Sequence, residues 1–283
     1  MALDFDFKNT IVREKQAEYL QFKNGGVNAH FYGANGFPLG VYTEFIKNLS
    51  NKFDLTCLSL RACWPNIGNA PKQTNWEIYA DDLIAFLEQN FTEPIIAIGH
   101  SQGATASIIA ASKRPDLFKS LIIIEPASVS RKWEYILKLV PYFIKKTQQP
   151  IKSALEKQDI WNSRDEFYKF IRKNKAYKRV SDKVLEDFAK FGLEKTENGK
   201  FKLSFSLEWE AANYSIAPSI WKYLKKINLP IQVIAGKPSI FFSNELREKW
   251  KQIAPNSLMS VNEQFGHLFP LEAPEICADL IKI

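Results

Sequence analysis

The sequence predicts an α/β domain in which a mostly parallel β-sheet carries helices on both faces and a helical segment is inserted between two strands. Three observations support this expectation. Short apolar runs alternate with helical patterns in the first and last parts of the chain. The alternation stops between about residues 129 and 224 and then resumes. A serine flanked by glycines, Ser101, stands where one apolar run passes directly into a helical pattern.

The first part of the chain supplies most of the predicted sheet. Strand-like pieces lie within residues 11–32, and Asn24-Gly25-Gly26 between them is typical of a hairpin turn. Tyr79, Leu83 and Phe86 share one face of an amphipathic helix predicted over 76–89. The other expected elements are a helix over 40–49 and strands over 53–60, 95–98 and 121–124, with a helix over 104–111.

The middle of the chain is helical in pattern and rich in lysine and aromatic residues, and one piece, 198–205, predicts a turn and a strand. The alternation then resumes with a strand over 231–235, a helix over 244–253, a strand over 258–261 and a helix over 274–281. We therefore expect a core domain made of residues 1–128 and 225–283, with residues 129–224 inserted as a helical cap.

Composition and charge restrict the class of protein. The 283 residues are 46% hydrophobic and 24% charged, as in a globular protein with a sizeable core. The net charge of +7 comes from scattered lysines, which favours a solvated surface over nucleic-acid binding. No apolar run reaches the roughly 20 residues of a membrane span, and the N-terminus lacks a signal-peptide pattern. The expectation is a cytoplasmic protein without stable membrane insertion.

The cysteines indicate neither a disulfide framework nor a metal site. Cys57, Cys63 and Cys277 are odd in number and have no metal-ligand spacing. We expect no metal and no cofactor.

Ser101 lies in Gly99-His-Ser-Gln-Gly103, between a buried strand and a buried helix. A strand that turns at once into a helix brings the residues two before and two after the serine against its backbone, so glycine is needed there. The turn exposes the Ser101 hydroxyl at the carboxyl end of the strand. The N-terminus of the next helix directs backbone N–H groups at any anion that forms beside it. The pattern predicts a nucleophilic serine.

The base for Ser101 is found among three histidines. His30 lies within a strand pattern, and His100 directly precedes the serine and is expected to point away from it. His267 lies in a loop between the last strand and the last helix, at the edge of an open α/β sheet that carries chemistry. We therefore predict His267 as the catalytic base.

These motifs resemble those of α/β-hydrolase fold proteins that carry a helical cap, and the resemblance covers nearly the whole chain. Gly99-His-Ser-Gln-Gly103 resembles the nucleophile elbow of that family, and Gly266-His-Leu-Phe-Pro-Leu-Glu-Ala-Pro274 resembles its histidine loop. Tyr32-Gly-Ala-Asn-Gly-Phe-Pro38 resembles its oxyanion loop, with Tyr32 where many members have histidine.

The resemblance implies a Ser–His–acid triad. Ser101 attacks a carbonyl carbon, and His267 takes the serine proton and later returns it to the leaving group. The oxyanion is expected to lie on the N–H of Gln102, and on an N–H of the oxyanion loop, that of Ala34.

The acid departs from the usual pattern of the family. In most members it follows the strand after the cap, but this turn reads Ala235-Gly-Lys-Pro-Ser239, with a serine at the expected position. Glu125 ends the strand that follows the nucleophile helix. Some members of the family look similar, because they place the acid at the end of that strand. A carboxylate at the end of an apolar strand is costly to bury unless it is paired. Glu125 is the first candidate, and Glu245, on the next predicted helix, stays open as the second. The third alternative is that the chain has no functional acid.

A serine at the elbow forms an acyl-enzyme from a carbonyl substrate. The sequence predicts a serine hydrolase and, within that class, a carboxylic-ester hydrolase. Its expected substrate is a small molecule with an apolar portion, because an aromatic-rich cap suits apolar groups. The alternative is a ligand-binding or receptor protein on the same fold with weak or no hydrolysis. The bond type, whether ester, thioester, lactone, amide or carbon–carbon, and the oligomeric state stay open.

Overall fold

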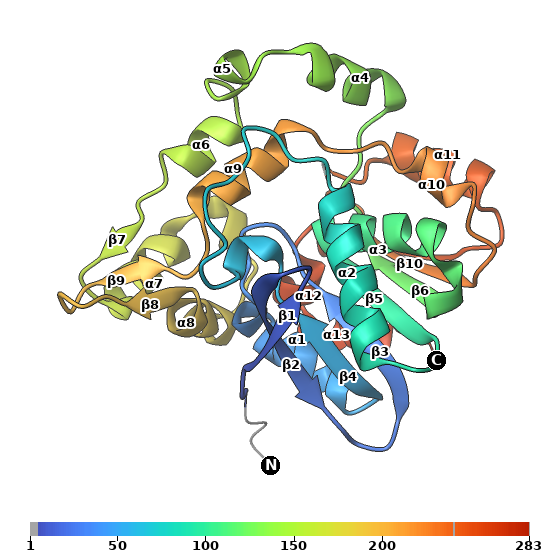
Figure 1. The fold of residues 1–283 in the computed structure, drawn as a ribbon, viewed down its shortest axis with the longest axis horizontal. Coiled ribbons are helices and arrows are strands. Elements are labelled where there is room, and N and C mark those ends of the chain that lie inside the picture. Colours follow the sequence, from blue (N-terminus) through green and yellow to red (C-terminus); the bar gives the residue numbers. More distant parts are fainter. Residues whose placement is uncertain (1–4, 240, 283) are drawn as a thin grey trace.

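The computed structural model describes residues 5–239 and 241–282. An eight-stranded sheet runs through its centre in the order β1-β2-β4-β3-β5-β6-β10-β11, and the six strands from β4 to β11 in that order are parallel (Figure 1). The strands are β1 Lys8–Val12, β2 Lys15–Phe22, β3 Val27–Tyr32, β4 Phe53–Leu58, β5 Ile95–His100, β6 Phe118–Ile124, β10 Ile231–Gly236 and β11 Leu258–Asn262.

Helices cover both faces of this sheet, as the strand–helix alternation predicts. Side chains of α1, α12 and α13 join one apolar cluster, and side chains of α2, α3, α10 and α11 join the cluster on the other face. Every residue of the central strand β5 is buried, which explains its unbroken apolar run. The helices are α1 Thr43–Ser50, α2 Glu77–Asn90, α3 Gln102–Lys113, α10 Trp221–Leu224, α11 Asn244–Ile253, α12 Phe269–Glu272 and α13 Pro274–Asp279, with 3₁₀ turns at Leu39–Tyr42, Arg61–Cys63 and Pro115–Leu117.

The hairpin predicted at Asn24-Gly25-Gly26 is wrong. β2 pairs with β1 and β4, and β4 lies between β2 and β3. The backbone N–H groups of these three residues donate to Asp54 Oδ1, which holds the chain where it passes the start of β4. The hairpin joins β1 to β2 instead, through Arg13 and Glu14, which adopt positive φ angles of 46° and 62° without glycine.

The segment inserted between β6 and β10 is mostly helical, and it also contains a small antiparallel sheet of order β7-β9-β8. The turn and strand predicted over 198–205 are present as the turn before β9. The insertion lies along one end of the main sheet (Figure 1). Its elements before α10 are α4 Arg131–Leu139, α5 Tyr142–Lys145, α6 Ile151–Leu155, β7 Ile160–Trp161, α7 Arg164–Lys173, a 3₁₀ turn Lys175–Tyr177, α8 Asp182–Phe191, β8 Leu193–Lys195, β9 Phe201–Leu203 and α9 Leu207–Ser215.

The insertion shares its apolar core with the sheet domain. Phe167 and Phe188, from α7 and α8, belong to the same buried cluster as Val41 and Phe45 next to β3. Side chains of the insertion and of the sheet domain bury one another in this cluster, so each part stabilises the other. The cap boundaries at residues 129 and 224 stay a prediction. Helix α10 lies at the end of this range, but it packs against α3 on the sheet.

No helix in the described ranges 5–239 and 241–282 is both long and apolar enough to cross a lipid bilayer.

Candidate active site

The strand register brings the candidate residues together at one edge of the sheet. His100 of β5 is opposite Ile124 of β6, and Ile124 is opposite Ile234 of β10. The next residues, Ser101 and Glu125, therefore leave neighbouring strands at the same level. Their backbone N–H groups still donate to the adjacent strands, at 3.0 Å and 2.9 Å.

Ser101 occupies a strained turn between β5 and α3. Its backbone has φ 53° and ψ −113°, a conformation that residues other than glycine rarely adopt outside functional turns. The glycine requirement is confirmed, but its reason differs from the predicted clash with the serine backbone. A Cβ on Gly99 would lie 2.5 Å from Cα of Ala104, and a Cβ on Gly103 would lie 2.1 Å from the carbonyl oxygen of Tyr32. The glycines let helix α3 approach β5 and the end of β3.

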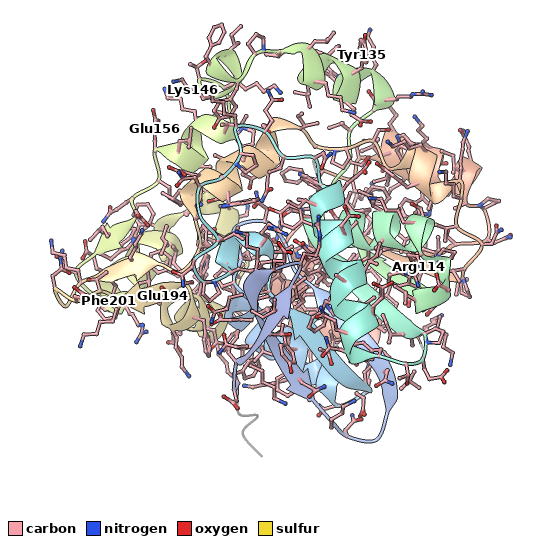
Figure 2. All side chains as sticks on the ribbon, in the orientation of Figure 1. Arg114, Tyr135, Lys146, Glu156, Glu194 and Phe201 are labelled. Carbon is pink, nitrogen blue, oxygen red and sulfur yellow. The ribbon has the colours of Figure 1, made fainter. Side chains whose placement is uncertain are left out.

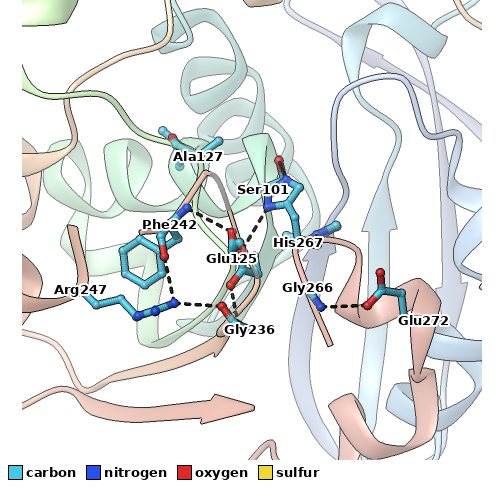
Figure 3. A network of polar contacts seen from close by, with 12 residues as sticks. Ser101, Glu125, Ala127, Gly236, Phe242, Arg247, Gly266, His267 and Glu272 are labelled. Atoms are coloured by element: carbon cyan, nitrogen blue, oxygen red, sulfur yellow. Dashed lines mark hydrogen bonds and ion pairs between the residues drawn. The ribbon is translucent and has the colours of Figure 1, made fainter. Parts of the chain in front are cut away.

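His267 bridges Ser101 and Glu125. Its Nε2 lies 2.9 Å from Ser101 Oγ, and its Nδ1 lies 3.2 Å from Glu125 Oε2 (Figure 3). The loop after β11 supplies this histidine, as the sequence predicts for its position. The structure thus brings all three predicted residues into one hydrogen-bonded row, the arrangement that serine hydrolases use to activate a hydroxyl.

Glu125 is fully buried and held by groups from the end of β10 and from the turn that follows it. The Gly236 N–H donates to its Oε1 at 2.5 Å, and the Ser239 hydroxyl donates to Oε2. Arg247 fixes this turn by donating to the carbonyls of Gly236 and Phe242 at 2.9 Å and 3.0 Å (Figure 3). These donors compensate the burial of the carboxylate. Ser239, which stands where most members of the family have the acid, thus donates a hydrogen bond to Glu125 on the neighbouring strand.

Glu245, the second candidate for the acid, lies in the first turn of α11 and is exposed. No hydrogen bond or ion pair joins it to His267 in the described part of the chain. The geometry therefore favours Glu125.

The two predicted oxyanion donors differ in their surroundings. Gln102 is the first residue of α3, and its N–H has no hydrogen-bond acceptor among the described residues, as expected at a helix N-terminus. The Ala34 N–H instead donates to the Tyr42 hydroxyl at 3.0 Å. This bond counts against Ala34 as a free donor, because one N–H has one hydrogen to give. Gln102 and Ala34 both stay predictions for the oxyanion hole.

A chain of hydrogen bonds that the sequence analysis did not predict reaches the backbone of His267. The hydroxyl of Tyr42 lies 2.8 Å from His100 Nδ1, and His100 Nε2 lies 2.8 Å from the carbonyl oxygen of His267. Since a carbonyl only accepts, His100 Nε2 carries the hydrogen and Nδ1 accepts from Tyr42. His100 points away from Ser101, as predicted, but it positions the backbone of His267. Its place in the elbow motif was the available signal.

Glu272 is a second supporting residue that the sequence did not single out. Its Oε2 accepts from the Gly266 N–H at 2.8 Å, next to His267, and its Oε1 lies 2.8 Å from Nη2 of Arg179 in the insertion. The loop that carries His267 is therefore tied to the inserted segment.

His30 is a structural residue, as its strand position predicts. It is fully buried, and its Nε2 accepts from the Leu58 N–H at 3.2 Å. Burial lowers the pKa of His30 from 6.5 to about 3. Burial, and then the neighbouring His267, lower the pKa of His100 to about 3 as well. Both imidazoles are neutral in the folded protein at ordinary pH.

Neutral burial of His30 predicts a loss of stability in mild acid. The unfolded chain binds a proton on this imidazole below about pH 6.5, whereas the folded protein does not until about pH 3, so acid favours unfolding. Replacing His30→Gln should flatten the fall in unfolding free energy by ~1.4 kcal/mol per pH unit between about pH 6 and about pH 4. Urea unfolding of both proteins at several pH values measures this. An unchanged slope would mean that His30 is protonated in the folded state.

A cavity of about 800 Å³ opens beside Ser101 and His267. The inserted segment supplies much of its apolar wall, so residues of the insertion and of the sheet domain line one space. Of the cap aromatics noted in the sequence, Trp133 lines the cavity, whereas Trp161 and Phe167 pack in the core and Tyr135 and Phe143 are exposed. The other aromatic lining residues are Phe37, Trp76, Tyr177, Tyr214 and Phe241.

The fold and this site agree with a family match. Residues 31–274 match the family model described as alpha/beta hydrolase fold. The chain belongs to the α/β-hydrolase family, and its enzyme class is that of a hydrolase.

Individual relatives are distant. The chain is 25% identical over 276 residues to the uncharacterized hydrolase YugF of Bacillus subtilis, covering 93% of each. It is 20% identical over 243 residues to the 2-(acetamidomethylene)succinate hydrolase of Mesorhizobium japonicum, covering 83% of this chain and 80% of that protein. A crystal structure of E-2-(acetamidomethylene)succinate hydrolase superposes with a TM-score of 0.80 at 17% identity, covering 98% of this chain and 97% of that one. The structural likeness concerns the fold.

Proposed function

We propose that the protein is a serine hydrolase that cleaves a small carboxylic ester through an acyl-enzyme. The observation that carries this proposal is a row of three hydrogen-bonded side chains. His267 Nε2 lies 2.9 Å from Ser101 Oγ, and His267 Nδ1 lies 3.2 Å from Glu125 Oε2. A hydroxyl in such a row can lose its proton to the imidazole as it attacks.

In the first half-reaction, Ser101 Oγ bonds to the carbonyl carbon and its proton moves to His267 Nε2. Glu125 holds the Nδ1–H tautomer and stabilises the imidazolium. The Gln102 N–H is suited to the oxyanion, because it begins helix α3 and has no other acceptor among the described residues. His267 then gives its proton to the leaving alcohol, and the acyl group stays on Ser101.

In the second half-reaction, a water attacks the acyl carbon and His267 takes its proton. The carbonyl oxygen is again an anion until Ser101 leaves and regains its proton from His267. The acid and a free serine are the products. An apolar cavity of about 800 Å³ suits a substrate with an apolar portion.

A fluorophosphonate probe tests the proposal directly, because only an activated serine is labelled. We expect labelling of the wild-type protein, with the modified peptide containing Ser101, and hydrolysis of p-nitrophenyl esters. Since one relative is named for an acetamido compound, the panel includes p-nitroanilides of the same acids. An unlabelled protein that still binds esters would instead support the ligand-binding alternative.

A further inference from the structure

Lys145 is a buried lysine at the end of α5, in the inserted segment, and it lines the same cavity as Ser101 and His267. Only 4% of its surface is exposed, so nearly all of the residue is covered by protein. The neighbouring Lys146 is exposed and does not line the cavity; Figure 2 shows it at the outer edge of the insertion. The two adjacent lysines thus have opposite environments.

The other charges of the cavity wall are paired. Glu210 accepts from Lys157 Nζ through both oxygens, at 2.8 Å and 2.7 Å. Glu272 pairs with Arg179 at 2.8 Å. Lys145 has no carboxylate within ion-pair distance among the described residues, and its one hydrogen-bond acceptor there is the neutral Gln73 Oε1, at 2.9 Å.

A buried cation without a counter-charge is unfavourable. Removing an ammonium group from water costs free energy that a single amide oxygen compensates only in part. Burial accordingly lowers the pKa of Lys145 below its ordinary value. The ammonium group has three hydrogens, of which Gln73 accepts one. An anion in the cavity would supply both the missing charge and further acceptors.

We propose that Lys145 binds a carboxylate on the substrate, at the end away from the bond that is cleaved. The inference rests on the proposed function and names its substrate class, an ester of an acid that carries a second carboxylate. One unpaired cation matches the single negative charge of a carboxylate. Trp133, Ile136 and Val140 of the same wall suit an apolar spacer between the two ends.

Matched esters test this proposal. Mono-p-nitrophenyl esters of dicarboxylic acids, from succinate to sebacate, are compared with p-nitrophenyl esters of the monocarboxylic acids of equal chain length. We expect wild-type protein to prefer the charged ester at one chain length, by about tenfold to a hundredfold in kcat/KM, the range of a charge-assisted hydrogen bond. Lys145→Met should abolish this preference, and Lys145→Arg should retain part of it. Lys146→Met is the matched control and should behave as wild type.

The proposal is overturned if the wild-type protein prefers the charged ester at no chain length. It is also overturned if this preference survives in Lys145→Met. If no ester is turned over, the proposed function fails, and binding decides the role of Lys145 separately. Isothermal titration calorimetry with the free dicarboxylates then compares wild type, Lys145→Met and Lys146→Met. Binding lost only in Lys145→Met supports the anion site. Equal binding by all three proteins, or by none, overturns it.

Discussion

Replacing Ser101→Ala is expected to abolish ester hydrolysis, with kcat/KM falling by a factor on the order of 10⁵ to 10⁶. The substitution removes the attacking oxygen and its bond to His267 Nε2. Alanine at φ 53° carries the same backbone strain as serine, so the elbow is expected to keep its shape. Steady-state assays with p-nitrophenyl esters give the effect on kcat/KM.

Circular dichroism and thermal unfolding of Ser101→Ala serve as the fold control. A folded variant that has lost both turnover and fluorophosphonate labelling would support Ser101 as the nucleophile. Turnover close to that of the wild type would instead place the chemistry elsewhere in the cavity and sink the serine-hydrolase proposal.

Glu125→Gln is expected to lower turnover by about 10⁴-fold, as an uncharged amide does in place of a triad acid. The amide removes the charge that stabilises the imidazolium, and its nitrogen can donate to His267 Nδ1, which favours the wrong tautomer. Because the change keeps the size of the side chain, its bond from Gly236 can persist. The reduction should appear in kcat, measured at saturating ester.

Glu245→Gln is the matched control, since the same chemical change is made on the exposed first turn of α11. It should leave turnover near that of the wild type. The reverse result would place the acid after β10. If neither variant matters, Ser239 or a water orients His267, and the ligand-binding alternative gains support.

The sequence predicted the elements that carry the site because local chemistry dictates them. An apolar run, a glycine-flanked serine and a run of small residues predict a strand, a tight turn and a helix around Ser101. The structure has this arrangement. The loop position of His267 followed from the order of strands and helices. Glu125 could be proposed because a carboxylate that ends an apolar strand needs partners.

Features that depend on long-range packing could not be read in the same way. Strand β4 lies between β2 and β3, and Asp54 of β4 accepts hydrogen bonds from the glycine turn, which comes from another part of the chain. The hairpin at Arg13 lacks the glycine that marks such turns. The cap aromatics look alike in sequence, and only tertiary packing decides that Trp133 faces the cavity while Phe167 enters the core.

The neutral state of the two buried histidines simplifies the interpretation of pH–rate profiles. The chain has three histidines, and those at positions 30 and 100 hold pKa values of about 3. A titration limb in kcat/KM well above pH 3 therefore does not come from either of these two imidazoles. In NMR spectra, the imidazole proton resonances of His30 and His100 should likewise stay in place between about pH 5 and pH 8. The pH–rate profile can thus be interpreted without mutating these two histidines.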